Sequence, residues 1–179
     1  MKIVVLTGSP HRDGTSNVLA EAFTRGAQEA GHIVRRFDCA FLKVHACTAC
    51  NQCRSGEAQP CVFQDDMWSL YDQLIAADAV VYVTPVYYHA MTAQLKTVID
   101  RFYGVNPQLC GVKKKAALLA VAASPHEWVM DGLKAWYQAD MRYLGWEDRG
   151  AVLATACASK QDIEQTDYPQ QAYELGKNF

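Results

Sequence analysis

The chain has 179 residues, half of them hydrophobic, and a formal net charge of −2. This length suits one domain, residues 1–179, with a sizeable buried core, and the slightly acidic balance speaks against a nucleic-acid partner. Every apolar stretch is shorter than the roughly 20 residues that span a bilayer, and strand-like residues begin at once where a secretory signal would stand. We therefore expect no membrane association, a cytoplasmic location and reduced thiols at the seven cysteines.

Apolar runs alternate with amphipathic helical patterns along the whole sequence. The runs are almost continuously apolar, as strands covered on both faces must be, and strands are expected at Lys2–Thr7, His32–Asp38, Ala79–Thr84, Ala116–Ala122 and Gly150–Thr155. Helical stripes lie between them at residues 19–30, 67–75, 91–102 and 133–144, with a weaker fifth at about 164–177. This alternation predicts an α/β fold, a doubly wound parallel sheet with helices on both faces.

Ligands of doubly wound sheets bind beyond the carboxyl ends of the strands. Three loops are expected to meet there, namely residues 8–17 after the first strand, 85–90 after the third and 123–127 after the fourth. A Cys-rich insertion at residues 39–64 follows the second strand and is unusually long for a connection of this kind. Long loops in compact domains are often functional, and this one holds five of the seven cysteines, four of them clustered at residues 47–61.

The first loop reads Gly-Ser-Pro-His-Arg-Asp-Gly-Thr-Ser-Asn over residues 8–17. A strand that turns directly into a helix aims free backbone N–H groups and the positive end of the helix dipole at one point, which favours a phosphate. The groups expected to bind it are Ser9, Thr15 and Ser16 as donors and His11 or Arg12 as positive charge. The sequence does not match the Walker A pattern, the dinucleotide fingerprint or a Cys-x5-Arg phosphatase loop. An ordinary turn capped by Thr15 or Ser16 remains the alternative.

This loop resembles the phosphate loop of the flavodoxin-like NAD(P)H-dependent FMN reductases. A second motif strengthens the likeness, Thr-Pro-Val-Tyr-Tyr-His-Ala-Met-Thr-Ala-Gln-Leu-Lys at residues 84–96, followed by Ile-Asp-Arg at 99–101. Two separated motifs in the right order are far more specific than one, and the resemblance extends over essentially the whole chain. It implies a flavodoxin-like fold with strand order 2-1-3-4-5 and FMN at the point where the winding reverses. It also implies that the phosphate is surrounded by Ser9, His11, Thr15, Ser16 and Asn17.

The second motif bears on where the flavin ring lies. Pro85 fixes the backbone, and the amides of Val86 and Tyr87 are expected to face the polar edge of the isoalloxazine and stabilise charge on the reduced ring. Tyr87 or Tyr88 would form an aromatic wall, or both tyrosines would pack under the following helix. Ser124 lies in the third loop, where the family often carries glycine, and is expected near the cofactor.

Four cysteines of the insertion have the spacing C-x2-C-x2-C-x7-C, at Cys47, Cys50, Cys53 and Cys61. Thiolates this close in sequence can wrap one [4Fe–4S] cluster, whereas structural zinc more often uses two CxxC pairs set further apart. The block from residue 47 to 67 resembles the iron–sulfur flavoproteins, a branch of the same superfamily, which implies a low-potential cluster that passes single electrons to FMN. Zinc binding, and roles without metal such as contact with a partner subunit over the flavin, remain alternatives. The remaining cysteines, Cys39, Cys110 and Cys157, are expected as small core residues.

The interpretation is an FMN-dependent oxidoreductase that passes electrons from NAD(P)H to a small-molecule acceptor, namely a quinone, a flavin, a nitro or azo compound, or a metal ion. The alternative is an iron–sulfur flavoprotein that carries electrons between FMN, a [4Fe–4S] cluster and a ferredoxin-like partner. We nominate no side chain as a general acid or base, because bound FMN carries the redox chemistry. The resemblance also implies a homodimer or homotetramer.

Overall fold

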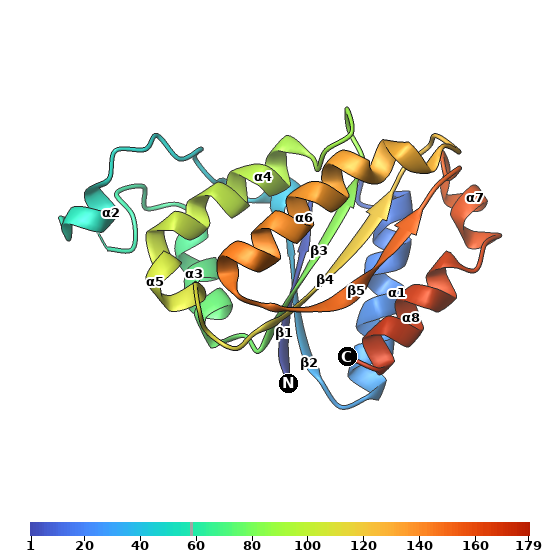
Figure 1. Ribbon diagram of the computed structural model, residues 1–179, viewed down its shortest axis with the longest axis horizontal. Coiled ribbons are helices and arrows are strands. Elements are labelled where there is room, and N and C mark those ends of the chain that lie inside the picture. Colours follow the sequence, from blue (N-terminus) through green and yellow to red (C-terminus); the bar gives the residue numbers. More distant parts are fainter. Residues whose placement is uncertain (58) are drawn as a thin grey trace.

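The computed structural model describes residues 1–57 and 59–179, and these form a five-stranded parallel sheet with strand order β2-β1-β3-β4-β5 (Figure 1). The strands are β1 (Lys2–Thr7), β2 (Ile33–Asp38), β3 (Ala79–Pro85), β4 (Lys115–Val121) and β5 (Glu147–Ala154). The predicted fold class and strand order are confirmed. The predicted start of β5 at Gly150 is three residues late, because the polar residues Glu147 and Asp148 still pair with β4 at the edge of the sheet.

Helices cover both faces of the sheet, as the chain's alternation of strands and helices predicts (Figure 1). The helices of eight or more residues are α1 (Thr15–Glu29), α3 (Met67–Ala76), α4 (Ala93–Asp100), α6 (Asp131–Leu144) and α8 (Tyr168–Lys177). Shorter helices are η1 (Cys39–Phe41), α2 (Gln52–Ser55), η2 (Arg101–Val105), α5 (Asn106–Leu109), η3 (Glu127–Met130) and α7 (Lys160–Glu164). Within the described residues, no helix has both the length and the apolar character needed to cross a membrane.

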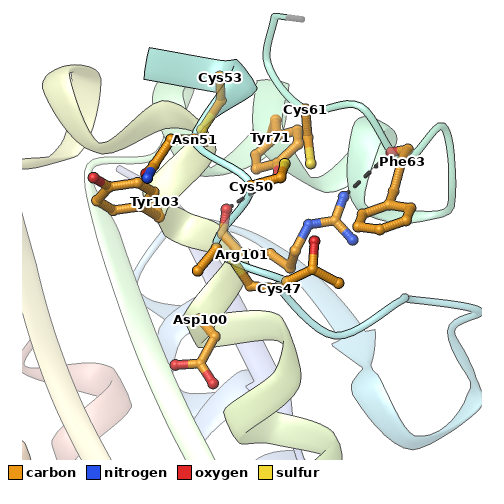
Figure 2. A pocket seen from close by; sticks show the side chains of 13 residues that line it. Cys47, Cys50, Asn51, Cys53, Cys61, Phe63, Tyr71, Asp100, Arg101 and Tyr103 are labelled. Carbon is orange, nitrogen blue, oxygen red and sulfur yellow. Dashed lines mark hydrogen bonds between the residues drawn. The ribbon is translucent and has the colours of Figure 1, made fainter. Parts of the chain in front are cut away.

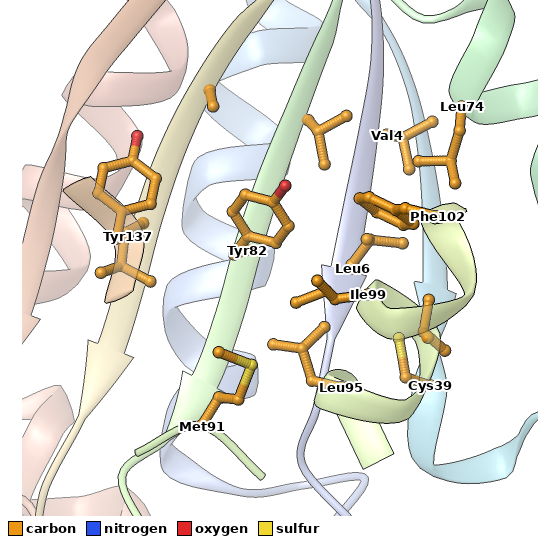
Figure 3. Packing of buried hydrophobic residues seen from close by; sticks show 14 of the residues in the cluster. Val4, Leu6, Cys39, Leu74, Tyr82, Met91, Leu95, Ile99, Phe102 and Tyr137 are labelled. Carbon is orange, nitrogen blue, oxygen red and sulfur yellow. The ribbon is translucent and has the colours of Figure 1, made fainter. Parts of the chain in front are cut away.

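Alternate residues of each central strand point to opposite cores. Val4 and Leu6 of β1 join Tyr82 of β3 in the core beneath α3, α4 and α6 (Figure 3). Ile3 and Val5 face the other way, into the core beneath α1, α7 and α8. Because both faces are covered, the strands read as continuous apolar runs in the sequence.

The C-terminal segment forms two helices where one was predicted over residues 164–177. The Ser159 hydroxyl accepts from the Asp162 amide while the Asp162 carboxylate accepts from the Ser159 amide, which is a capping box that begins α7. A proline in the first turn, Pro169, then begins α8 after a break. Turn chemistry, rather than periodicity, separates the two helices.

Helices α1 and α8 approach each other more closely than side chains would allow. A Cβ atom on Gly26 would lie 2.1 Å from the carbonyl oxygen of Tyr173, and one on Gly176 would lie 2.2 Å from that of Phe23. Glycine at both positions therefore lets the two backbones touch. This contact fixes the C-terminal helix against the helix that follows the first loop.

The Cys-rich insertion extends away from the sheet beside α3 and α5 (Figure 1). It begins at η1, contains the single-turn α2, and ends where α3 starts; residue 58 of the predicted insertion lies outside the described residues. The backbone amide of Met67 donates to Asp65 Oδ1 (3.1 Å), which gives the first residue of α3 a side-chain acceptor. The insertion thus leaves the sheet after β2 and rejoins the fold at a defined residue, the start of α3.

Candidate functional site

The loop between β1 and α1 is fastened to β3 and α4. The Gly8 amide donates to the carbonyl of Val83 (2.8 Å), and the Gly8 carbonyl accepts from the hydroxyl of Thr92 (2.8 Å) at the start of α4. A Cβ atom on Gly8 would lie 2.4 Å from that hydroxyl oxygen, so a larger residue would push the loop away from α4. Glycine at this position allows the loop to sit directly on the carboxyl edge of the sheet.

Asn17 holds the loop in shape from inside. Its Nδ2 donates to the carbonyls of His11 (2.8 Å) and Arg12 (2.5 Å), while its Oδ1 accepts from Arg36 (2.8 Å). Arg36 also donates to Asp38 (2.6 Å). Burial alone would raise the pKa of the Asp38 carboxyl, but hydrogen bonds from Thr7 and Arg36 hold it below its ordinary value. Asn17 therefore positions the loop through a charged network that extends to β2.

The start of α1 has polar groups without hydrogen-bond partners among the described residues. Its N-cap is Gly14, and none of the described side chains caps it, so the expected alternative of a turn capped by Thr15 or Ser16 is wrong. The Ser16 hydroxyl oxygen is buried and has no hydrogen-bond partner within residues 1–57 and 59–179. Leaving a buried hydroxyl unsatisfied costs about 1–3 kcal/mol. Since an anion bound at this helix end would satisfy Ser16, the loop fits a phosphate group.

A cleft of about 400 Å³ opens beside this loop, which is within the range of small-molecule sites. The predicted site residues that line it are Ser9, His11, Thr15, Pro85, Val86 and Tyr87. Asn17, Tyr88 and Ser124 lie outside the lining, as does Ser16, whose buried hydroxyl lies in the first turn of α1 next to the lining residue Thr15. The loops after β1 and β3 thus meet at one cleft, as the topology predicts.

The segment after β5 completes the cleft and was missed by the sequence analysis. Its lining residues are Cys157, Ala158, Ser159 and Lys160. Lys160 Nζ lies 2.5 Å from Asp13 Oδ1, so the first loop is linked to the start of α7 by an ion pair, and the pKa of Lys160 is raised by its hydrogen bond to Asp13. The sequence could have indicated this segment only by its place after the fifth strand, because all parallel strands end at the same edge of the sheet.

The loop after β3 differs from the expected arrangement. The amide of Val86 donates to the carbonyl of Val121 (2.8 Å), and that of Tyr87 donates to Ala90 (2.9 Å). The expectation that these two amides face a flavin is therefore wrong, because β3 keeps pairing with β4 and the loop closes on itself in a tight turn. Tyr88 and His89 occupy the left-handed region in this turn, with φ of 47° and 64°.

The tyrosines of this loop do not pack under α4. Tyr87 borders the cleft with 44% of its surface exposed, and Tyr88 is 99% exposed beyond it. In the third loop, the Ser124 hydroxyl accepts from the amide of His126 (3.3 Å). Of these residues, Tyr87 is the one whose position suits an aromatic wall.

The four clustered cysteines line a second, separate pocket at the other end of α4 (Figure 2). Cys47, Cys50, Cys53 and Cys61 surround it together with the junction of α4 and η2. All four are free thiols. Burial raises the pKa of Cys53, and the neighbouring thiols, Cys61 first, raise it further.

The donor set of this pocket consists of four thiols, and thiolates are the protein ligands of [4Fe–4S] clusters. Among the described residues, no three His, Cys, Asp or Glu side chains are grouped closely enough to hold one metal ion. The thiolates of a cluster bind different irons and so stand further apart than the ligands of one ion. The space between the thiols is about 20 Å³, so the loop would move outward around a cluster. The four thiols around one pocket fit the predicted ligand set, which stays a prediction.

A family model described as NADPH-dependent FMN reductase matches residues 1–144. This chain belongs to that family. It is 32% identical to an iron–sulfur flavoprotein of Archaeoglobus fulgidus, over 93% of this chain and 85% of the relative. Another protein of that name, from Methanosarcina thermophila, is 32% identical over 69% of this chain and 64% of the relative.

Solved structures agree on the fold. A NAD(P)H:quinone oxidoreductase from Methanothermobacter marburgensis superposes with a TM-score of 0.72 at 20% identity, over 99% of this chain and 96% of its own. An azoreductase from Bacillus anthracis gives a TM-score of 0.78 at 18% identity over the whole of both chains. The FMN reductase family membership makes this protein an oxidoreductase with FMN as its cofactor and a nicotinamide nucleotide as its reductant.

Proposed function

We propose that this protein transfers electrons from NAD(P)H to a small-molecule acceptor such as a quinone, a free flavin, a nitro or azo compound, or a metal ion. FMN, when bound in the cleft, would supply the redox chemistry between the nicotinamide and the acceptor. The observation that carries the proposal is the buried Ser16 hydroxyl without a partner among the described residues, at the start of α1 and beside the 400 Å³ cleft.

The residues of the cleft have separate tasks in this proposal. Ser9, Ser16 and the first amides of α1 bind the phosphate, and His11 and Thr15 line the same end of the cleft. Lys160 offsets the negative charge of Asp13, which would otherwise repel an anion held by the same loop. Pro85, Val86 and Tyr87 form the side of the cleft that borders the flavin ring.

The test is flavin retention in a variant of the phosphate loop. Ser16→Asp places a carboxylate where the phosphate would bind, and we expect the purified variant to lose its bound FMN. Gln28→Asp adds the same charge at an exposed position of the same helix and is expected to retain it. The measurement is the flavin absorption spectrum of folded protein before and after NADPH. A folded Ser16→Asp variant with wild-type flavin content would contradict the proposal.

A second function, an electron carrier with a [4Fe–4S] cluster, is favoured by the pocket that collects all four clustered cysteines. In this function single electrons pass between FMN, the cluster and a ferredoxin-like partner. Iron and acid-labile sulfide measured on anaerobically prepared protein test it, with four of each expected per chain. Cys50→Ser is expected to lower both, and Cys110→Ser, outside the pocket, to leave both unchanged. Absence of iron after anaerobic reconstitution would exclude this function.

We further propose a homodimer or homotetramer. Exposed aromatic side chains beside the cleft support this, with Tyr88 99% and Trp128 59% exposed and His89 packed against Trp128 at 5.0 Å between ring centroids. The two sites of one chain lie at opposite ends of α4, whose eight residues rise about 12 Å. Sedimentation equilibrium of flavin-loaded protein gives the mass, and a monomer would contradict this proposal.

A further inference from the structure

Arg101 is a buried cation at the junction of α4 and η2. It is 1% exposed, and its two terminal nitrogens are fully engaged. Nη1 donates to the carbonyl of His45 and to Asp65 Oδ2, both at 2.7 Å, and Nη2 donates to Asp65 Oδ1 and to the carbonyl of Phe63, both at 3.2 Å. The guanidinium therefore ties down the chain on both sides of the four cysteines.

The third nitrogen of Arg101 is different. Nε is buried and finds no hydrogen-bond partner in the part of the chain that the structure describes. The arginine side chain also lines the cysteine pocket, where Figure 2 shows it beside Cys47, Cys50 and Cys61. Leaving a buried N–H of a charged group without an acceptor costs free energy. A ligand that accepts a hydrogen bond from Arg101 Nε would remove this cost.

We propose that Arg101 Nε donates a hydrogen bond to a sulfur atom of a [4Fe–4S] cluster held by the four cysteines. The sulfur is either a cysteine Sγ or a bridging sulfide of the cluster. This inference rests on the second function proposed above. Hydrogen bonds to sulfur and a nearby positive charge stabilise the more negative, reduced form of a cluster, so Arg101 raises the potential at which the cluster accepts an electron.

The ion pair with Asp65 makes this contact a rigid one. Burial alone would raise the pKa of Asp65, but its hydrogen bonds with Arg101 hold that pKa below the ordinary value, so the carboxylate stays charged. With both ends of the guanidinium fixed, the Nε–H direction is fixed as well. Arg101 thus anchors the cysteine segment through its terminal nitrogens, and its Nε stays without a partner among the described residues at the wall of the thiol pocket.

The direct test uses the wild-type chain, loaded with iron and sulfide, with ¹⁵N only in the guanidinium groups of its arginines. After reduction of the cluster with dithionite, pulsed electron paramagnetic resonance is expected to show a ¹⁵N hyperfine coupling. The coupling should vanish in Arg101→Lys. It should persist in Arg54→Lys, which removes the guanidinium that stacks on Tyr103 of the pocket wall. A cluster signal without ¹⁵N coupling in the wild-type chain would overturn the inference.

The second test is the midpoint potential of the cluster, followed by the same resonance signal during a redox titration. Arg101→Lys is expected to shift the potential downward, while Arg54→Lys leaves it at the wild-type value. Equal potentials in all three proteins would overturn the inference. If the wild-type chain binds no iron at all, the electron-carrier function fails and this inference with it, whereas a normal cluster without coupling overturns the role of Arg101 alone.

Discussion

Ser16 and Thr24 lie about two turns apart on α1, and the hydroxyl oxygen of each is buried without a partner among the described residues. Only Ser16 is near the loop that is expected to bind phosphate. The two residues therefore form a matched pair, in which one missing hydrogen bond is to be filled by a ligand and the other is not.

We expect Ser16→Ala to weaken FMN binding by roughly 10- to 100-fold, the equivalent of one hydrogen bond to a charged group at about 1.5–3 kcal/mol. The stability of the flavin-free protein should be unchanged or slightly higher, because a buried unsatisfied hydroxyl is removed. Thr24→Val is the control and should bind FMN normally. The measurement is titration of flavin-free protein by quenching of FMN fluorescence. Equal affinities of the two variants would show that Ser16 does not contact the phosphate.

Asp65→Asn should destabilise the protein by about 2–4 kcal/mol, because it leaves the buried guanidinium of Arg101 without its counter-ion. The control is Asp100→Asn, which breaks an exposed pair with Lys96 and should cost about 0.5 kcal/mol or less. Urea denaturation at pH 7 measures both. Since the pKa of Asp65 is lowered by folding, its stabilisation is present above the unfolded pKa of about 4 and lost as the pH falls below it. The cost of Asp65→Asn should therefore shrink in acid.

Gly26→Ala should destabilise the protein by about 2–4 kcal/mol, because its methyl group would meet the backbone of α8 at 2.1 Å. Helix propensity alone would predict the opposite sign, since alanine is favoured over glycine by about 1 kcal/mol. Glu21→Ala on the exposed face of the same helix is the control and should change stability little. Thermal unfolding of the flavin-free proteins gives the answer, and a stabilised Gly26→Ala would contradict the close approach of α1 and α8.

Asp140 of α6 predicts a pH dependence of stability. Burial raises its pKa to about 6, although a hydrogen bond from Tyr82 (3.4 Å) opposes the shift. The folded state therefore binds more protons than the unfolded chain between about pH 4 and 6. The free energy of unfolding is accordingly highest, as far as Asp140 is concerned, below pH 4, and it falls as the pH rises to 6. The loss is about 3 kcal/mol at most. Asp140→Asn should be more stable than wild type at pH 7 and equal to it at pH 4, as measured by urea denaturation at both pH values.

Tyr88→Gly should stabilise the isolated chain by up to about 1 kcal/mol. Tyr88 is 99% exposed and occupies the left-handed region at φ 47°, which costs an ordinary residue about 1–2 kcal/mol and glycine nothing. Tyr143→Gly is the contrast, since Tyr143 is also exposed but lies in α6, where glycine costs about 1 kcal/mol. Opposite changes in urea midpoint are expected for the two variants at low protein concentration. A destabilised Tyr88→Gly would show that the ring makes contacts absent from the single chain.

The sequence predicted elements well where burial sets the pattern. The range of β1 is the same in prediction and structure, because its apolar residues end where the polar loop begins. The start of β5 was misplaced because its first residues are polar and pair at an exposed edge, where hydrophobicity carries no signal. The break between α7 and α8 was missed because it depends on one capping serine and one proline.

The site was predictable in part. The first and third strands end in recognisable motifs, and their loops do meet at one cleft. Ser159 and Lys160 could not be identified, because serine and lysine after a strand are common and only the topology brings them to the cleft. The hydrogen-bond partners of the Val86 and Tyr87 amides are backbone carbonyls of β4 and of the turn itself. Such backbone pairing cannot be recognised from residue types.

Thr92 closes over the first loop at one end of α4, while Asp100 and Arg101 reach the thiol pocket at the other. Each end is held by its own bonds, so the two prosthetic groups proposed for this chain would be inserted and lost separately. Loss of the proposed [4Fe–4S] cluster on exposure to air should accordingly leave a yellow protein that still holds FMN. Removal of FMN by dialysis should leave a brown protein that still holds the cluster.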